Sequence, residues 1–362
     1  MKRSVFIIII ATLMTACPGC AFAASDAPDI SAECAVVMHG GDTVFEKNAD
    51  TRSLIASTTK IMTAIITIEN CELDSELEVD AESCALEGSS MYLRPGQRIT
   101  VEDLLYGLLL VSGNDAADAL ARYTAGDIES FAALMNEKAQ SLGMTETSFS
   151  NPHGLDADNH YSTARDMAVL MEYCMQDEEF HRIISAPSRQ IGDETIYNHN
   201  KLLWRCNGCI GGKTGYTIAA GRCLVSCCER EGTRFVCVTL SDPDDWNDHC
   251  KLYDWAFARY ADKKPLSPEA LPEIAVISGA EYTVSVIPAE EPTVFLPRDA
   301  ELTLRFNLPR FAFAPINAGD TAGSYEIIYN GETVAAGELL YADTIPLLKR
   351  ASGNLYQRTE LA

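Results

Sequence analysis

Ser57-Thr58-Thr59-Lys60 places a hydroxyl and an amine three residues apart. Side chains with this spacing share one face of a helix, so the Lys60 amine can reach the Ser57 hydroxyl. A neutral lysine there can act as a general base that turns a weak alcohol into a nucleophile. For the isolated motif, a helix N-cap serine beside a surface lysine is the simpler interpretation.

A second motif, Ser112-Gly113-Asn114, lies between two predicted helices. Its serine can relay a proton and its asparagine can bind a substrate amide. Ser, Gly and Asn are also common turn residues, so an ordinary helix-ending turn explains this motif when it is taken alone.

The third motif, Lys213-Thr214-Gly215, offers a cation and a hydroxyl that suit a carboxylate. Gly212-Lys213-Thr214 also matches the end of a phosphate-binding loop, but that loop requires glycine where Asn207 stands. The segments that follow, 221–229 and 233–241, are predicted strands, whereas a phosphate-binding loop continues into a helix. An exposed lysine on an ordinary strand remains the plain alternative, although glycines at 211–212 are unusual in one.

All three motifs together, in this order, resemble those of the active-site serine penicillin-recognising enzymes. Within that group the chain is similar to the low-molecular-mass penicillin-binding proteins, the serine D-alanyl-D-alanine carboxypeptidases of the peptidase S11-like family. The resemblance covers about residues 30–260. The segments that carry it are SLIASTTKIMTA (53–64), GSSMYLRPGQRITVEDLLYGLLLVSGNDAADALA (88–121), FSNPHGLD (149–156), YSTARDMA (161–168) and GGKTGYTIAAGRCLVS (211–226).

This resemblance implies a mixed α/β (α+β) fold. A β-lactamase/transpeptidase-like catalytic domain, with an antiparallel sheet and a helical lobe, would be followed by a small all-β domain. The implied boundaries are a signal peptide at 1–23, the catalytic domain at 24–262 and a β-sandwich-like domain at 263–362.

The resemblance also implies the chemistry. The substrate would be the D-Ala-D-Ala end of a peptidoglycan stem peptide, and β-lactam antibiotics would be covalent inhibitors. The catalytic residues would be the nucleophile Ser57, its base Lys60 and the proton relay Ser112. The substrate-binding residues would be Asn114, Lys213, Thr214, Gly215 and Tyr216, with the backbone N–H groups of Ser57 and Tyr216 as the oxyanion hole. No metal or organic cofactor is expected.

Two other functions are compatible with the same motifs. A serine β-lactamase shares them, but Ser-Gly-Asn at 112–114 in place of Ser-Asp-Asn and the added β-module argue against it. A non-catalytic peptidoglycan-binding or sensor protein is the other alternative, and the three intact motifs argue against that one.

The chain departs from the family pattern at three places. His199 and the acidic segment 241–248 stand where relatives often carry basic residues near the carboxylate pocket. The tail 347–362 is short and weakly patterned for an amphipathic membrane helix, so the sequence leaves membrane attachment open.

Helices must position the first two motifs. The pattern predicts them near 57–70, 100–112, 115–123, 127–142, 163–176 and 245–261, and two strands around a glycine turn over 33–47. Beyond a Pro-rich link at 262–273 strand alternation takes over, as in 325–342 with Asn330-Gly331 as a hairpin turn.

The N-terminus has the charge and hydropathy pattern of a secretory signal, with small residues before position 24. A lipoprotein signal ending at Cys17 is the alternative, so an exported protein at the outer face of the membrane or in the cell wall is expected. The net charge of −24 disfavours nucleic acid as a partner.

The chain has 13 cysteines, and five of them crowd around Lys213: Cys206, Cys209, Cys223, Cys227 and Cys228. Cys-x-x-Cys at 206–209 is compatible with zinc or redox chemistry, but no second such pair follows at zinc-finger spacing. Buried reduced thiols are the favoured interpretation over disulfides or a metal site.

Overall fold

Five antiparallel strands form the central sheet, in the order β2-β1-β9-β8-β7. The computed structural model describes residues 27–348, so the expected signal peptide, with Cys17, and most of the tail lie outside the described residues. The strands of this sheet are β1 (Cys34–His39), β2 (Asp42–Lys47), β7 (Cys209–Thr217), β8 (Gly221–Arg230) and β9 (Thr233–Leu240).

Strand β8, which lies between β9 and the edge strand β7, has buried apolar residues on both of its faces. Alternate residues of a strand point to opposite sides of the sheet. Accordingly Cys223 and Val225 pack in one core cluster, while Leu224 and Cys228 pack in another. Layers of helices cover both sides of the sheet, which explains why all residues from Cys223 to Cys228 are buried.

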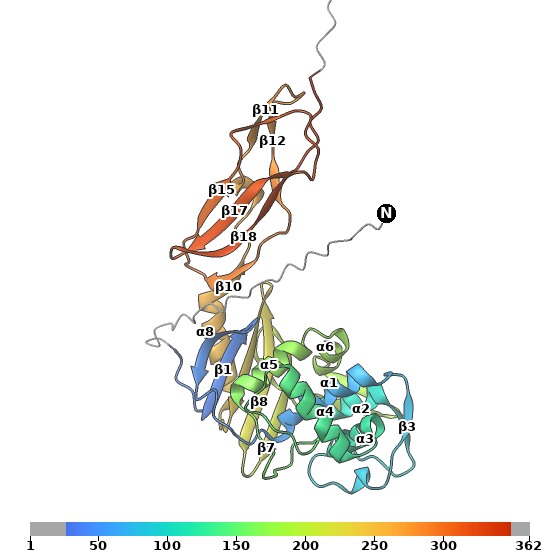
Figure 1. Cartoon of the computed structure of the whole chain (residues 1–362). Coiled ribbons are helices and arrows are strands. Elements are labelled where there is room, and N and C mark those ends of the chain that lie inside the picture. Colours follow the sequence, from blue (N-terminus) through green and yellow to red (C-terminus); the bar gives the residue numbers. More distant parts are fainter. Residues whose placement is uncertain (1–26, 349–362) are drawn as a thin grey trace, which may run out of the picture.

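Helices of the first core lie on one side of the sheet and α8 lies on the other (Figure 1). Thr100 begins α2, and its hydroxyl accepts a hydrogen bond from Asp103 N at 3.1 Å, as expected for an N-cap. The helices are α1 (Lys60–Asn70), α2 (Val101–Leu110), α3 (Asn114–Ala125), α4 (Ile128–Ser141), α5 (Ala164–Cys174), α6 (Glu178–Ile184), α7 (Leu202–Arg205) and α8 (Asp245–Arg259).

All six predicted helices exist, with shifted ends. The helix expected at 57–70 begins with a 3₁₀ turn, η1 (Ala56–Thr59), and becomes α-helical only at Lys60. The helix expected to reach residue 261 stops at Arg259, because the chain then enters a strand. Short elements were not predicted: the helices α6 and α7, η2 (Ser83–Ala85), the antiparallel pair of β3 (Glu76–Glu78) with β4 (Arg98–Thr100), and the hairpin of β5 (Ser188–Ile191) with β6 (Glu194–Tyr197).

From residue 260 onward the chain forms strands and one short 3₁₀ turn. A third core cluster is built from residues between Leu266 and Ile345 alone. The predicted turn Asn330-Gly331 joins β17 to β18, with both residues at positive φ (52° and 86°). The elements are β10 (Tyr260–Lys263), η3 (Pro268–Ala270), β11 (Ile274–Ile277), β12 (Thr283–Val284), β13 (Val286–Pro288), β14 (Val294–Pro297), β15 (Thr303–Asn307), β16 (Phe311–Phe313), β17 (Thr321–Tyr329) and β18 (Glu332–Tyr341).

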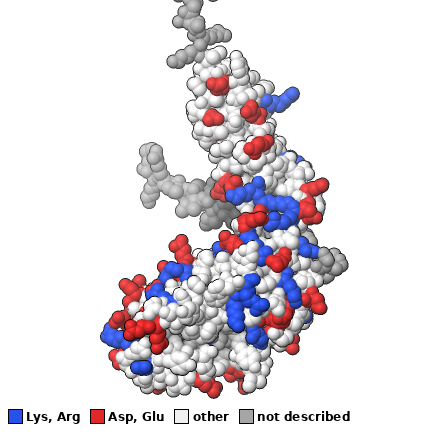
Figure 2. Space-filling view, turned by 180° about the vertical axis from the view of Figure 1, so that it is seen from behind, with Lys and Arg blue, Asp and Glu red and all other residues white. Residues whose placement is uncertain are grey.

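The two parts meet through β10. This strand directly follows α8 and pairs antiparallel with β14, and Phe295 of β14 packs against the core under α8. In the view of Figure 2, acidic and basic side chains mix around this junction, whereas the far end of the β-module carries few charges. The mixed α/β architecture and the all-β C-terminal part expected from the sequence are confirmed.

Candidate active site

Ser57 and Lys60 lie at the start of the helix that crosses the first core. The Lys60 Nζ is 3.0 Å from the Ser57 Oγ, so the two side chains meet as their spacing predicts. Ser57 is half-buried and Lys60 is fully buried. A hydroxyl in contact with a buried amine has the geometry of an activated nucleophile.

Two other groups surround the Lys60 amine. Its Nζ donates to Asn114 Oδ1 at 2.7 Å and to the backbone carbonyl of His153 at 2.5 Å. A neutral amine has two hydrogens and one lone pair. Both hydrogens are used on these two acceptors, so the lone pair is left to accept the hydrogen of the Ser57 hydroxyl. The His153 carbonyl is a weak competitor for that hydrogen, because it lies 3.5 Å from the Ser57 Oγ, at the outer limit for a hydrogen bond.

The environment of Lys60 favours the neutral form. Burial lowers the pKa of Lys60 well below its ordinary value, and the charge of Lys213 lowers it further, while Asp115 acts in the opposite direction. The lowered pKa of Lys60 and its contact with the Ser57 hydroxyl therefore both indicate that Lys60 can accept the Ser57 proton.

Ser112 and Asn114 stand at the junction of α2 and α3, where Ser112 has a positive φ of 65°. The Ser112 hydroxyl is 3.0 Å from Lys213 Nζ. Asn114 donates from Nδ2 to the Glu87 carbonyl at 2.6 Å, which directs its Oδ1 toward Lys60. The motif is thus more than a helix-ending turn, because its two side chains contact the two buried lysines.

Lys213, Thr214 and Gly215 lie on the edge strand β7. Lys213 is 1% exposed, and its Nζ donates to the Thr214 carbonyl at 2.8 Å as well as contacting Ser112. Burial lowers the pKa of Lys213 to about 7. The interpretation as an exposed strand lysine is therefore wrong, and the strand β8 that follows excludes a phosphate-binding loop.

Gly215 is required by the approach of β7 to the nucleophile. A Cβ at this position would lie 3.1 Å from Ser57 N and 3.0 Å from the Ile55 carbonyl. The next residue, Tyr216, is exposed, as is Ile218 in the turn after it. The strand β7, Ser57 and the Ser112 motif therefore converge on one place.

The sequence analysis missed a histidine that holds the turn under Ser57. His160 Nδ1 accepts from Ser150 N at 3.1 Å, so its Nε2 carries the hydrogen and donates to Thr59 Oγ1 at 2.7 Å. Thr59 in turn donates to the carbonyl of Ala56, a residue with a positive φ of 46°. Burial lowers the pKa of His160 to about 4, which keeps the ring neutral in this chain of hydrogen bonds.

Gly154 completes this support. A Cβ on Gly154 would lie 2.0 Å from the Ala56 carbonyl oxygen, so only glycine fits. The segment FSNPHGLD, at 149–156, marks this loop in the sequence, but its function depends on backbone atoms brought close by the fold.

Asp115 was also missed. Its carboxylate accepts from Met91 N and Leu93 N, each at 3.0 Å, and from Ser90 Oγ at 2.6 Å. Gly113 packs against the same loop, since its Cβ would lie 3.3 Å from Met91 N. Asp115 therefore fixes the 88–93 loop beside Asn114.

The departures from the family pattern have local explanations. Burial and then the charge of Lys213 lower the pKa of His199, so this histidine adds no cation to the pocket. Asp242 and Asp248 both bind the Ser31 hydroxyl, and Asp245 pairs with Arg222 at 2.7 Å. These three acids of the 241–248 segment thus tie the N-terminal segment and β8 to α8.

The described residues contain no group of three or more His, Cys, Asp or Glu side chains arranged to hold a metal ion. Within the same range, 27–348, no helix has the length and apolar character needed to cross a membrane.

Comparison with known proteins agrees with this geometry. The model of the peptidase S11 family, D-alanyl-D-alanine carboxypeptidase, matches residues 21–244. The chain is 34% identical to D-alanyl-D-alanine carboxypeptidase DacC of Escherichia coli K12, covering 90% of this chain and 88% of the relative. It is 28% identical to D-alanyl-D-alanine carboxypeptidase DacF of Bacillus subtilis 168, covering 98% and 99%.

Solved structures show the same fold. Penicillin-binding protein 5 from Haemophilus influenzae superposes with a TM-score of 0.68 at 28% identity, over 89% of this chain and 99% of that one. Penicillin-binding protein 6B from Escherichia coli superposes with a TM-score of 0.70 at 26% identity, over 86% and 96%. These matches, together with the Ser57–Lys60 pair, show that the chain belongs to the peptidase S11 family of serine D-alanyl-D-alanine carboxypeptidases.

Proposed function

We propose that this protein removes the terminal D-alanine from peptidoglycan stem peptides through an acyl-enzyme on Ser57. The observation that carries the proposal is the surroundings of Lys60 Nζ. Two of its contacts, to Asn114 Oδ1 and the His153 carbonyl, accept hydrogens, and the third is the Ser57 hydroxyl at 3.0 Å.

In the first step Ser57 Oγ attacks the carbonyl carbon of the penultimate D-alanine while Lys60 takes the hydroxyl proton. The hydrogen bonds of Asn114 and His153 hold the amine in place as it becomes charged. The backbone N–H groups of Ser57 and Tyr216 receive the developing oxyanion, and each such donor contributes about 10²–10³ in rate in other enzymes.

In the second step the proton that Lys60 took from Ser57 passes to Ser112, which returns Lys60 to its neutral form. Ser112 gives its own hydroxyl proton to the departing D-alanine nitrogen. Its hydroxyl lies 3.0 Å from Lys213 Nζ, so the two groups can share a proton. Water then hydrolyses the ester between Ser57 and the remaining peptide, with Lys60 as the base.

Recognition of the free C-terminus rests on Lys213 and Thr214. The pKa of Lys213 is about 7 because the amine is buried. A substrate carboxylate beside Lys213 favours its charged form. That charge in turn keeps the pKa of Lys60 low, so binding of the correct substrate supports the base.

We place the reaction outside the membrane, on the basis of the N-terminal signal pattern, and assign residues 24–262 to the catalytic domain and 263–362 to a β-module that acts as a spacer or docking element. The separate core between Leu266 and Ile345 supports this division. The pairing of β10 with β14 supports a fixed junction between the two parts.

Two assays test the proposal. The purified protein is incubated with a peptide ending in D-Ala-D-Ala, and free D-alanine is measured for the wild type and for Ser57→Ala. Release by the wild type alone supports the carboxypeptidase. If neither protein releases D-alanine and the wild type does not turn over penicillin, the non-catalytic alternative holds. If the wild type turns over penicillin rapidly and spares the peptide, the protein is a β-lactamase.

A further inference from the structure

Four cysteines lie together at the start of β7, outside the catalytic machinery. Cys206 follows α7, Cys209 begins β7, Cys228 lies on β8 and Cys250 lies on α8. The Sγ atoms of Cys206 and Cys228 are 3.8 Å apart. Cys250 lies close enough to Cys206, and Cys228 close enough to Cys209, to lower the pKa of the neighbouring thiol.

Other cysteines of the described residues have a different kind of neighbour. The Sγ of Cys34 contacts the Ser53 hydroxyl, that of Cys71 contacts the Thr124 hydroxyl, and that of Cys223 contacts the Leu54 carbonyl. All eleven cysteines in the described range are free thiols. Within the cluster of Cys206, Cys209, Cys228 and Cys250, a sulfur–sulfur contact therefore sets Cys206 and Cys228 apart from these three cysteines.

The backbone fixes this proximity. Gly208 has a positive φ of 79°, and its Cβ would lie 2.5 Å from the Glu229 carbonyl. Glu229 N donates to the Gly208 carbonyl at 2.8 Å, and Arg230 Nε donates to the Asn207 carbonyl at 2.9 Å. The turn between Cys206 and Cys209 is thus clamped onto the end of β8, which holds the Cys206 and Cys228 sulfurs 3.8 Å apart, whereas a disulfide bond has a length of about 2.05 Å.

The two sulfurs of the closest pair differ in reactivity. Hydrogen bonds from Cys228 and Cys250 lower the pKa of Cys206, and the guanidinium of Arg230, with its Nη2 3.9 Å from Cys206 Sγ, acts in the same direction. Burial raises the pKa of Cys228. Since the thiolate is the nucleophile in thiol–disulfide exchange, Cys206 is the attacking sulfur and Cys228 the resolving one.

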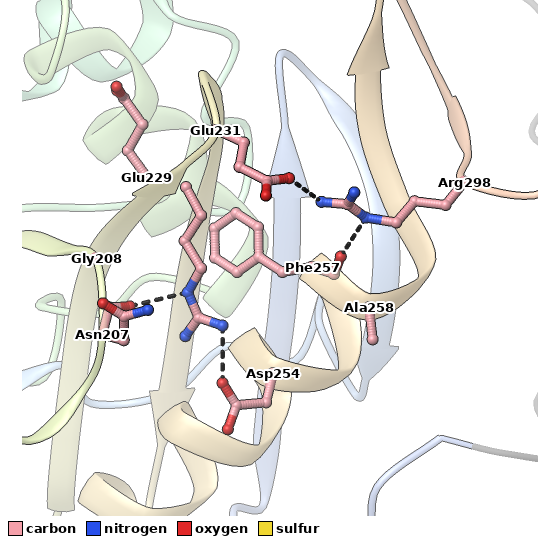
Figure 3. Close-up of a pocket in the computed structure, with 9 residues that line it drawn as sticks. Asn207, Gly208, Glu229, Glu231, Asp254, Phe257, Ala258 and Arg298 are labelled. Carbon is pink, nitrogen blue, oxygen red and sulfur yellow. Dashed lines mark hydrogen bonds and ion pairs between the residues drawn. The ribbon is translucent and has the colours of Figure 1, made fainter.

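A cavity of about 620 Å³ lies beside this site. It lies between the end of β8, α8 and the β-module, with Arg298 and Glu231 paired on one side (Figure 3). Asn207 and Arg230 both line it: Asn207 follows Cys206 in the chain, and Arg230 Nη2 contacts the Cys206 sulfur. A small molecule in the cavity therefore meets the Arg230 side of the thiol cluster.

We propose that Cys206 and Cys228 are a thiol–disulfide exchange site that closes to an intramolecular disulfide on reaction with a small-molecule disulfide. The Cys206 thiolate attacks one sulfur of the reagent, forms a mixed disulfide and releases one thiolate. The Cys228 thiol then gives its proton to the departing group, while its sulfur attacks the Cys206 sulfur and releases the second half of the reagent as a thiol. The protein loses two hydrogens, and the reagent is reduced to two thiols.

Oxidised glutathione tests the proposal on the purified folded protein. The wild type should lose two thiols without gaining glutathione mass, and a digest should contain the Cys206–Cys228 cross-linked peptide. Cys228→Ser should retain one glutathione on Cys206. Cys206→Ser should slow the loss of thiols at least tenfold, whereas Cys174→Ser, which replaces a buried cysteine on α5, should react like the wild type.

A second readout needs no substitution. Closure should raise the thermal midpoint of the wild type by about 5–10 °C, and dithiothreitol should reverse the shift. The proposal is overturned if glutathione is found on Cys71 or Cys84 while Cys206 and Cys228 stay reduced. It is also overturned if the protein binds one zinc ion per chain and chelation alone exposes these thiols.

Discussion

The floor and the wall of the active site each contain one buried lysine, and the two lysines have different surroundings. On the floor, built by η1 and α1, Lys60 Nζ has Asn114, His153 and Ser57 as partners. On the wall, built by β7, Lys213 Nζ has the Ser112 hydroxyl and the Thr214 carbonyl. The partners of Lys60 thus suit proton transfer, while the Lys213 amine can still donate a hydrogen bond to a ligand.

The two lysines also differ in what lowers their pKa values. The pKa of Lys60 is lowered by burial and by Lys213, whereas that of Lys213 is lowered by burial alone, to about 7. A neutral Lys60 and a Lys213 that becomes charged when substrate binds can therefore coexist in one small site. Substitution of each lysine should have a different effect.

Removal of the floor lysine should have the largest effect. Lys60→Met keeps the volume of the side chain and removes the base, so acylation of Ser57 should slow by roughly 10²–10⁴-fold. Stopped-flow measurement of penicillin acylation gives the rate. Lys138→Met, which removes a partly exposed lysine paired with Glu69, is the matched control and should change the rate less than twofold. An equal loss in both variants would contradict the assignment of Lys60 as base.

Substitution of the wall lysine should act on substrate choice. A charge-assisted hydrogen bond contributes about 1.5–3 kcal/mol, so Lys213→Gln should lose about ten- to a hundredfold in kcat/KM on a peptide with a free C-terminus. The matched peptide with a C-terminal amide should be poor for the wild type and lose little more. Exposed Lys201→Gln serves as the control. Equal losses on both peptides would mean that Lys213 acts mainly on the pKa of Lys60.

The pH profile should separate floor and wall without any substitution. As pH falls through the lowered pKa of Lys60, the base becomes protonated and kcat/KM should fall. As pH rises through about 7, free Lys213 loses its charge, so kcat/KM on the free-carboxylate peptide should fall again. The alkaline decrease should be absent with the amide peptide. An alkaline limb of the same size on both peptides would exclude Lys213 as its cause.

Loss of the β-module should have the smallest effect on chemistry. Its core is separate, and none of the catalytic motifs lies in it. A chain ending at Lys264 should be acylated by penicillin within about threefold of the full-length rate, a margin that reflects exposure of the surface now covered by Phe295. Circular dichroism checks that the shortened chain is folded. A folded but unreactive chain would contradict independent action of the catalytic domain.

The floor and the wall also differ in how much of each the sequence could predict. The spacing of Ser57 and Lys60 fixes their contact locally, and the three motifs identify the residues that converge. The support from His160 could not be predicted, because it acts on the Ala56 carbonyl through Thr59, and only the fold brings these atoms together. Asp115 binds backbone N–H groups of a distant loop for the same reason.

The sequence could also predict the fold only in part. Long helices with a clear apolar period were predicted with ends shifted by a few residues. The β5–β6 hairpin was missed because its four-residue strands are mostly polar and exposed. The junction at β10 was also missed, since its partner β14 lies about 35 residues further along the chain and no local pattern marks the pair.

Mass spectrometry of the intact protein after brief incubation with penicillin tests the central claim most directly. The account predicts one drug adduct on the wild type that persists for minutes or longer, located on Ser57 by peptide mapping, and no adduct on Ser57→Ala. An adduct of equal occupancy on Ser57→Ala, or one mapped to another residue of the wild type, would contradict it.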